Sequence, residues 1–333
     1  MTDQSILSLH NVSRVFATKP DFAESLAIKA GLRKPPKAVH AVSDVDLSVQ
    51  RGEVVGLVGE SGCGKSTLGR MVAGIMPPSA GEVRWQGRAL AEMDRQARTA
   101  TKLKVQMIFQ DPYSSLNPRM RVAEIVGEAP RVHGILKDEE PGYIDRQLER
   151  AGLSPAIRRR YPHQFSGGQR QRIGIARALA VRPEFLVCDE AVAALDVSIQ
   201  AQILNLFMDL RDELGLTYLF ISHDLGVVEH ISDRVAIMYL GRIVETAPTD
   251  ELFARPNHPY TDALLKQIPK IETRQKAFDP LKGELPSPIS PPSGCAFHPR
   301  CPHATDLCRV EAPRLKEIAS GHRSACHLND GVI

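Results

Sequence analysis

The sequence has no long hydrophobic run and no large excess of one charge. Its longest strongly apolar stretches, Val54–Val58 and residues 236–240, are far shorter than the roughly 18 residues of a membrane-spanning helix. Lysine and arginine number 42 against 39 aspartates and glutamates, a balance that does not favour a nucleic-acid partner. The first residues lack the basic and then apolar pattern of a secretory signal. These absences predict a cytoplasmic protein without a membrane span of its own.

Cysteine is scarce except near one end of the chain. Four of the six cysteines follow a cluster of prolines; they are Cys295, Cys301, Cys308 and Cys326. From about residue 282 onward, proline, cysteine and histidine replace helical patterning. This segment would therefore need a source of stability other than a hydrophobic core, such as a bound metal or cross-links. Because cytoplasmic thiols stay reduced, clustered cysteines indicate a metal site rather than disulfides.

Apolar runs and amphipathic segments alternate along most of the 333 residues. The expected strands are residues 45–49, Val54–Val58, 105–109, 185–188, 218–221 and 235–238. Helices are expected at residues 65–73 and 198–214, the second with an apolar stripe at helical spacing. Strands that alternate with helices predict an α/β fold with a parallel sheet covered on both faces.

A glycine-rich loop follows the expected strand Val54–Val58 and precedes an expected helix. It consists of Gly59, Glu60, Ser61, Gly62, Cys63, Gly64, Lys65, Ser66 and Thr67, which fits G-x-x-x-x-G-K-[ST]. The glycines let backbone N–H groups surround phosphate oxygens, and the helix N-terminus adds partial positive charge. Lys65 is expected at the β- and γ-phosphates of ATP, and the Ser66 hydroxyl at Mg²⁺. We interpret Cys63 as a small filler.

Two carboxylates follow the apolar strand at residues 185–188. Asp189 fits an outer ligand of Mg²⁺, and Glu190 projects one residue further, where it could polarise the water that attacks the γ-phosphate. Such a pair at a strand end is common. In combination with the phosphate loop it predicts an ATPase site.

A further motif stands between the loop and the acid pair and opens a helix-like run. It consists of Ser166, Gly167, Gly168 and Gln169, and by itself it could be an ordinary turn before a helix. It resembles the signature of ATP-binding cassette (ABC) proteins, and the remaining family motifs follow in the right order. Physically, a serine cap and two glycines leave a helix N-terminus open to an anion. The resemblance implies that this signature closes on ATP held by a partner cassette in a head-to-tail dimer.

The other motifs of the resemblance carry further roles. Gln110 matches the Q-loop glutamine, which would touch Mg²⁺ or the attacking water, and Asp196 matches the D-loop. His223 matches the switch histidine that senses the γ-phosphate, although a lone histidine there could simply be hydrogen-bonded at a strand end. Phe16 is the candidate for stacking on the base, with His40 as a weaker substitute.

The resemblance also implies the domain organisation. An ABC-type P-loop domain for nucleotide binding would cover residues 1–270, with an inserted helical subdomain at about 120–165. A short Cys-rich C-terminal appendage would cover residues 271–333.

A finer resemblance is to the ATP-binding subunits of oligopeptide and dipeptide importers. It rests on residues 110–119, 161–164, 257–261, 283–288 and 294–297. Similar chains also serve nickel, glutathione, opines or oligosaccharides. In this family the spacing of the cysteines looks like the four-cysteine site of a [4Fe–4S] cluster, which we expect at Cys295, Cys301, Cys308 and Cys326. Zinc and free thiols are the alternatives.

The resemblance therefore implies an ATP-hydrolysing subunit that energises peptide import from the cytoplasmic face of the membrane. Its partners would be two transmembrane permeases, a related but non-identical ATP-binding subunit and, indirectly, an extracytoplasmic solute-binding protein. The alternatives are a soluble non-transport ABC ATPase and a non-hydrolysing regulatory cassette. The single signature and the chain length disfavour the first, and Glu190 with His223 disfavours the second.

Overall fold

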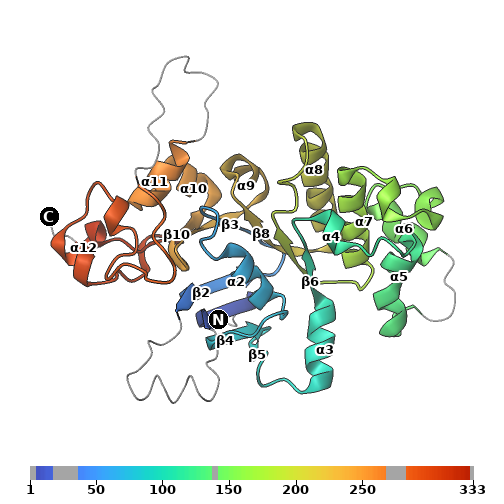
Figure 1. Cartoon of the computed structure of the whole chain (residues 1–333), viewed down its shortest axis with the longest axis horizontal. Helices are drawn as coiled ribbons and strands as arrows, with labels where there is room; N and C mark the ends of the chain where they lie inside the picture. Colours follow the sequence, from blue (N-terminus) through green and yellow to red (C-terminus); the bar gives the residue numbers. More distant parts are fainter. Residues whose placement is uncertain (1–4, 18–36, 137–141, 268–282, 331–333) are drawn as a thin grey trace.

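The computed structural model describes residues 5–17, 37–136, 142–267 and 283–330 (Figure 1). Its centre is an eight-stranded sheet in the order β11-β12-β10-β9-β3-β8-β7-β6. The parallel strands are β3 (Val54–Val58), β6 (Val105–Ile108), β7 (Phe185–Asp189), β8 (Thr217–Ser222) and β9 (Arg234–Tyr239). All residues of β3, β7 and β8 are buried, as expected for parallel strands covered on both faces.

Alternating residues of the central strands enter two different cores. On β7, Leu186 and Cys188 pack with residues of α7 (Gly167–Leu179), α8 (Val197–Leu214) and α9 (Leu225–Ile231). Phe185 and Val187 face the other way, toward α2 (Lys65–Val72) and a second, antiparallel sheet. The period of two along each strand thus places helices on one face of the sheet and a mixed layer on the other.

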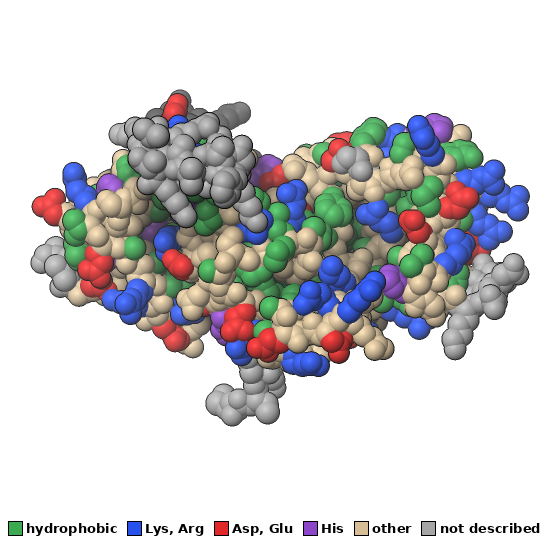
Figure 2. Space-filling model, turned by 60° about the horizontal axis from the view of Figure 1, so that its bottom comes forward, with side chains coloured by type: hydrophobic (Ala, Val, Ile, Leu, Met, Phe, Trp, Pro, Cys, Tyr) green, Lys and Arg blue, Asp and Glu red, His purple; other side chains and the backbone are tan. Residues whose placement is uncertain are grey.

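The second sheet has the strand order β2-β1-β4-β5. Its strands are β1 (Ser5–Ala17), β2 (Ala38–Gln50), β4 (Ala80–Trp85) and β5 (Arg88–Ala89). The helix α3 (Arg95–Lys104) follows and leads into β6. On the face drawn in Figure 2, basic and acidic side chains are interspersed with apolar ones.

The segment expected to be a helical insertion is helical. It holds α5 (Val122–Val132), α6 (Tyr143–Arg150) and the 3-10 turns Pro155–Arg159 and Pro162–Gln164, preceded by the short α4 (Pro112–Ser115). These elements pack around α7 at one end of the molecule (Figure 1). The α/β fold with an inserted helical subdomain is therefore confirmed.

The C-terminal region corrects the expectation of a purely parallel sheet. The strand β10 (Arg242–Pro248) pairs antiparallel with β9, and β12 (His322–Ser324) and β11 (Lys316–Ala319) extend that edge. The helices of this region are α10 (Thr249–Ala254), α11 (Pro259–Leu265) and α12 (Asp306–Val310), and it also holds the 3-10 turns His298–Arg300 and His327–Asp330. Residues after 282 are thus attached by strand pairing and packing. The boundary expected at residue 270 falls outside the described residues and stays a prediction.

Within the described ranges, no helix has both the length and the apolar character needed to cross a membrane.

Candidate nucleotide-binding site

The glycine-rich loop connects the central strand β3 to α2. Gly64 has φ +108°, and a Cβ atom there would lie 2.1 Å from the Ala41 carbonyl oxygen. At Gly59 a Cβ would lie 2.1 Å from the Met238 carbonyl oxygen. Only glycine fits both positions, because the loop passes directly against the backbone of β2 and β9. Gly64 also leaves the N-terminus of α2 without a side-chain cap, so its N–H groups can bind an anion.

Lys65 lies folded back over this loop and is 5% exposed. Its Nζ donates to the carbonyl oxygens of Gly59, at 2.6 Å, and Glu60, at 3.0 Å. Behind it, Ser66 Oγ donates to Asp189 Oδ1 at 2.8 Å. Burial raises the pKa of Asp189, although the hydrogen bond from Ser66 opposes the shift. The two residues expected at Mg²⁺ are therefore in direct contact, and their hard oxygens are of the kind that Mg²⁺ prefers.

The three expected catalytic residues come together at the ends of neighbouring strands. Gln110 Nε2 donates to Glu190 Oε2 at 2.7 Å, and His223 Nδ1 lies 3.5 Å from Glu190 Oε1. They follow β6, β7 and β8, whose carboxyl ends lie side by side. Glu190 has a left-handed backbone (φ +49°), and its N–H donates to the Ile221 carbonyl at 2.9 Å. This uncommon conformation fixes the glutamate between Gln110 and His223.

The expected signature forms the start of α7. Ser166 Oγ accepts from the Gln169 N–H at 3.3 Å, and Gln169 Oε1 accepts from the Ser166 N–H at 3.1 Å, which makes a capping box. A Cβ at Gly168 would lie 2.5 Å from Ile199 Cγ2 of α8, so this glycine has a packing reason of its own. Gly167 has room for a Cβ, 3.7 Å from Leu195.

The structure also shows the positions and exposure of three further residues that the sequence analysis singled out. Asp196 precedes α8 and is exposed, and its side chain does not cap that helix. Phe16 is on β1, 37% exposed, with the Arg14 guanidinium 4.8 Å from its ring centre. Cys63 is 1% exposed and burial raises its pKa, as expected for a filler. The remaining loop residues, Ser61, Gly62 and Thr67, lie between β3 and the first turn of α2.

Two residues at the loop were not anticipated. The Glu60 N–H donates to Tyr260 Oη at 3.0 Å, and Arg300 Nη1 donates to both Glu60 carboxylate oxygens, at 2.9 and 3.1 Å. Tyr260 and Arg300 lie 200 and 240 residues further along the chain. No local pattern could connect them to the loop.

The prediction of an iron–sulfur cluster is wrong. Cys295, Cys301, Cys308 and Cys326 are all described, yet the described part of the chain holds no group of three or more His, Cys, Asp or Glu that could bind a metal ion. The zinc alternative fails for the same reason.

The appendage is held instead by its own packing. Phe297 is 2% exposed and joins the core cluster of β9 and α11. His322 Nε2 lies 2.7 Å from Oε1 of the fully buried Glu245. Buried side chains therefore stabilise this region, in place of the metal site that the sequence analysis predicted.

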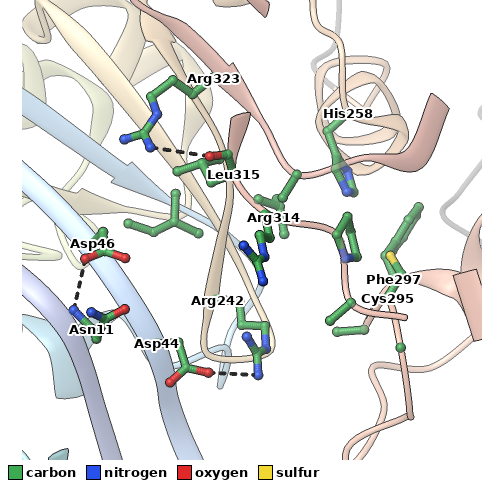
Figure 3. Close-up of a pocket in the computed structure, with 17 residues that line it drawn as sticks. Asn11, Asp44, Asp46, Arg242, His258, Cys295, Phe297, Arg314, Leu315 and Arg323 are labelled. Carbon is green, nitrogen blue, oxygen red and sulfur yellow. Dashed lines mark hydrogen bonds and ion pairs between the residues drawn. The ribbon is translucent and has the colours of Figure 1, made fainter. Parts of the chain in front are cut away.

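A cavity of about 510 Å³ lies where the C-terminal region meets β2 and β10. Figure 3 shows Arg242 paired with Asp44, at 3.3 Å, and Phe297 beside Cys295. None of the phosphate-loop residues lines this cavity. It is thus separate from the nucleotide site.

A phosphate loop after the central strand, an acid pair on β7 and a signature at the start of α7 define an ABC-type P-loop ATPase. Two family models match: "ABC transporter" over residues 42–193 and "Oligopeptide/dipeptide transporter, C-terminal region" over residues 244–308. The chain belongs to the ATP-binding proteins of ABC transporters, in the oligopeptide/dipeptide group.

Individual relatives are similar over nearly their whole length. The oligopeptide transport ATP-binding protein AppF of Bacillus subtilis is 46% identical over 98% of both chains. The dipeptide transport ATP-binding protein DppF of Haemophilus influenzae is 48% identical over 90% of this chain and 92% of its own. Among solved structures, a dimer of the ATP-binding cassette MJ0796 with ADP and Pi is 27% identical, with a TM-score of 0.61 over 73% of this chain and 98% of that one.

Proposed function

We propose that this protein is the ATP-hydrolysing subunit of an importer for oligopeptides, dipeptides or related solutes. The observation that carries the proposal is the Glu190 carboxylate, held between Gln110 and His223 next to Asp189 and the phosphate loop. The match of residues 244–308 to the oligopeptide/dipeptide C-terminal region supports the solute class.

The loop glycines and the N-terminus of α2 bind the phosphates of ATP, and Lys65 leaves the Gly59 and Glu60 carbonyls to meet the β- and γ-phosphates. Ser66, Asp189 and Gln110 would hold Mg²⁺, which would supply neutralisation of the phosphate charge when bound. Glu190 polarises the attacking water, and His223 contacts the γ-phosphate. Phe16 stacks on the base.

A second cassette completes the site. Ser166, Gly167, Gly168 and Gln169 present the start of α7 to the ATP of a related, non-identical partner subunit, and the exposed Asp196 lies in the contact between the two. The cassette MJ0796, which is a dimer with ADP and Pi, supports this arrangement. Two permease subunits anchor the pair at the cytoplasmic face of the membrane, and a solute-binding protein delivers the solute outside.

The test is Glu190→Gln in the complex purified with its permeases and reconstituted in vesicles. We expect ATP turnover to fall by about 100-fold or more, because the amide cannot polarise water. Nucleotide binding stays, because the carboxylate does not hold phosphate. The matched control is Glu184→Gln at the opposite end of β7, where Glu184 pairs with Arg51 and Lys104.

Near-normal turnover of Glu190→Gln would refute the catalytic role. If peptide-loaded binding protein does not stimulate ATP turnover by the wild-type complex, the proposed solute class is refuted.

A further inference from the structure

Glu60, the second residue of the phosphate loop, is held at three points. Its N–H donates to Tyr260 Oη at 3.0 Å, and its carbonyl accepts from Lys65 Nζ at 3.0 Å and from the Cys63 N–H at 3.3 Å. Its carboxylate accepts from Arg300 Nη1, which lies 2.9 and 3.1 Å from the two oxygens. Of these partners, Tyr260 and Arg300 belong to the C-terminal region, which the activity proposed above does not use.

The contact with Arg300 is sheltered from water. The Arg300 side chain is only 5% exposed and that of Glu60 is 28% exposed. The guanidinium carbon also lies 5.9 Å from the ring centre of Tyr239. Charge-assisted hydrogen bonds in such surroundings are stronger than exposed ion pairs, which contribute little.

An aromatic cluster fixes both partners to the central sheet. The ring centres of Tyr239 and Tyr260 are 4.7 Å apart, and Phe297 lies 5.2 Å from Tyr239 and 5.4 Å from Tyr260. Tyr239 ends β9, the neighbour of β3, and Phe297 directly precedes the 3-10 turn His298–Arg300. Figure 3 shows Phe297 next to Cys295, on the side of the cavity where His258 lies. Arg300 is therefore presented to the loop by a rigid support.

Elsewhere in the loop the Cys63 carbonyl accepts from the Gly241 N–H at 2.8 Å, and Gly59 and Gly64 pack against backbone. Among the described residues, no other charged side chain of the C-terminal region forms a hydrogen bond or ion pair with the loop. A Cβ at Gly62 would meet nothing within 4 Å, so the tip of the loop is open. Lys65 must leave the carbonyl of Glu60 when it turns to phosphate. The bond from the Cys63 N–H then remains within the loop, and the bonds from Tyr260 and Arg300 are the ones that tie Glu60 to the C-terminal region.

We propose that Arg300 is a positioning residue of the nucleotide site: through Glu60 it holds the phosphate loop in its binding conformation, so that the C-terminal region raises the affinity for nucleotide. The inference rests on the proposed function only in naming ATP as the ligand. A preorganised loop does not have to be ordered during binding, and this lowers the free-energy cost of binding.

The test is Arg300→Gln in the full chain, with MgADP binding measured by calorimetry and ATP turnover measured at steady state. We expect the Kd for MgADP and the KM for ATP to rise about fivefold to tenfold, a typical coupling between two sites. The kcat should change by less than about twofold, because Glu190, Gln110 and His223 are untouched.

Three variants make the result specific. Arg309→Gln is the matched control, since Arg309 is 67% exposed and pairs only loosely with Asp306, at 3.8 Å. Arg300→Lys keeps the charge and should recover part of the affinity. Glu60→Gln should weaken binding as Arg300→Gln does, and the double variant should be no weaker than either single one, because both remove the same contact. If Arg300→Gln does not fold, MgADP binding by Glu60→Gln still tests the same contact.

A lowered melting temperature with an unchanged Kd would overturn the proposal and leave Arg300 a structural residue. A Kd shift equal to that of Arg309→Gln would also overturn it. If wild-type protein binds MgADP in an Arg300-dependent way but never hydrolyses ATP, the proposed function fails while the positioning role stands.

Discussion

The phosphate loop and the C-terminal region are held in their conformations by opposite means. The loop depends on glycines at positions where its backbone lies directly against other backbone, as at Gly64 against Ala41. The C-terminal region depends on side chains that meet from distant segments. Glu245, with no exposed side-chain surface, accepts from the N–H groups of Asn257 and His258 and contacts His322.

This difference explains how a change in each region should act. The loop itself supplies the groups that would bind phosphate, so damage there should remove binding. The C-terminal region has no continuous motif, and its loss should first appear as lower stability and then, through Arg300, as weaker nucleotide binding. The predictions below test this division, beginning with the largest effect.

Gly64→Ala should abolish nucleotide binding and lower the free energy of unfolding by more than about 3 kcal/mol. The alanine would combine φ +108° with a Cβ atom 2.1 Å from the Ala41 carbonyl oxygen. Urea denaturation and MgADP calorimetry measure both effects. Gly62→Ala is the matched control: it has φ +80° but no neighbour within 4 Å, so only backbone strain of about 1–2 kcal/mol is expected. Equal losses in the two variants would contradict the steric explanation.

Phe297→Ala should destabilise the C-terminal region by about 3–5 kcal/mol, the usual cost of truncating a buried phenylalanine. Phe297 is 2% exposed and packs on Tyr239 and Tyr260. Denaturation curves and limited proteolysis after residue 282 provide the measurement. Val310→Ala, at a residue that is 77% exposed, should leave both unchanged. A small loss for Phe297→Ala would mean that another contact holds the region.

The sequence predicted the phosphate loop and the acid pair because each is short, continuous and followed by the expected element. It also placed the buried strands correctly, since apolar runs are a local signal. Glu190 was predicted as the catalytic group, a role that stays a prediction. Its contacts with Gln110 and His223 follow from the rule that parallel strands carry their carboxyl ends to one edge.

The C-terminal region could not be predicted in this way. Its four clustered cysteines stand out in the sequence and led to the wrong prediction of a metal site. The residues that stabilise the region are instead a glutamate, a histidine and a phenylalanine, which carry no such signal. Glu245, His322 and Phe297 acquire their roles only through partners from other segments. The contact of Arg300 with Glu60 spans 240 residues and has no sequence signal at all.

The smallest effect concerns pH and again separates the two regions. Burial lowers the pKa of His258 to about 4, although its contact with the Ala325 carbonyl opposes the shift. The unfolded chain takes up this proton near pH 6.5, so its contribution to stability is complete above pH 6.5 and is lost as the pH falls toward 4. We expect a loss of about 2 kcal/mol at pH 5, measured by urea denaturation. His258→Asn keeps an acceptor for the Tyr260 N–H and should flatten the dependence of stability on pH, whereas His133→Asn at an exposed helix end should not.

An equally steep pH dependence in His258→Asn would assign the acid sensitivity to another group. The phosphate loop contains no histidine, so this histidine titration acts on the C-terminal region.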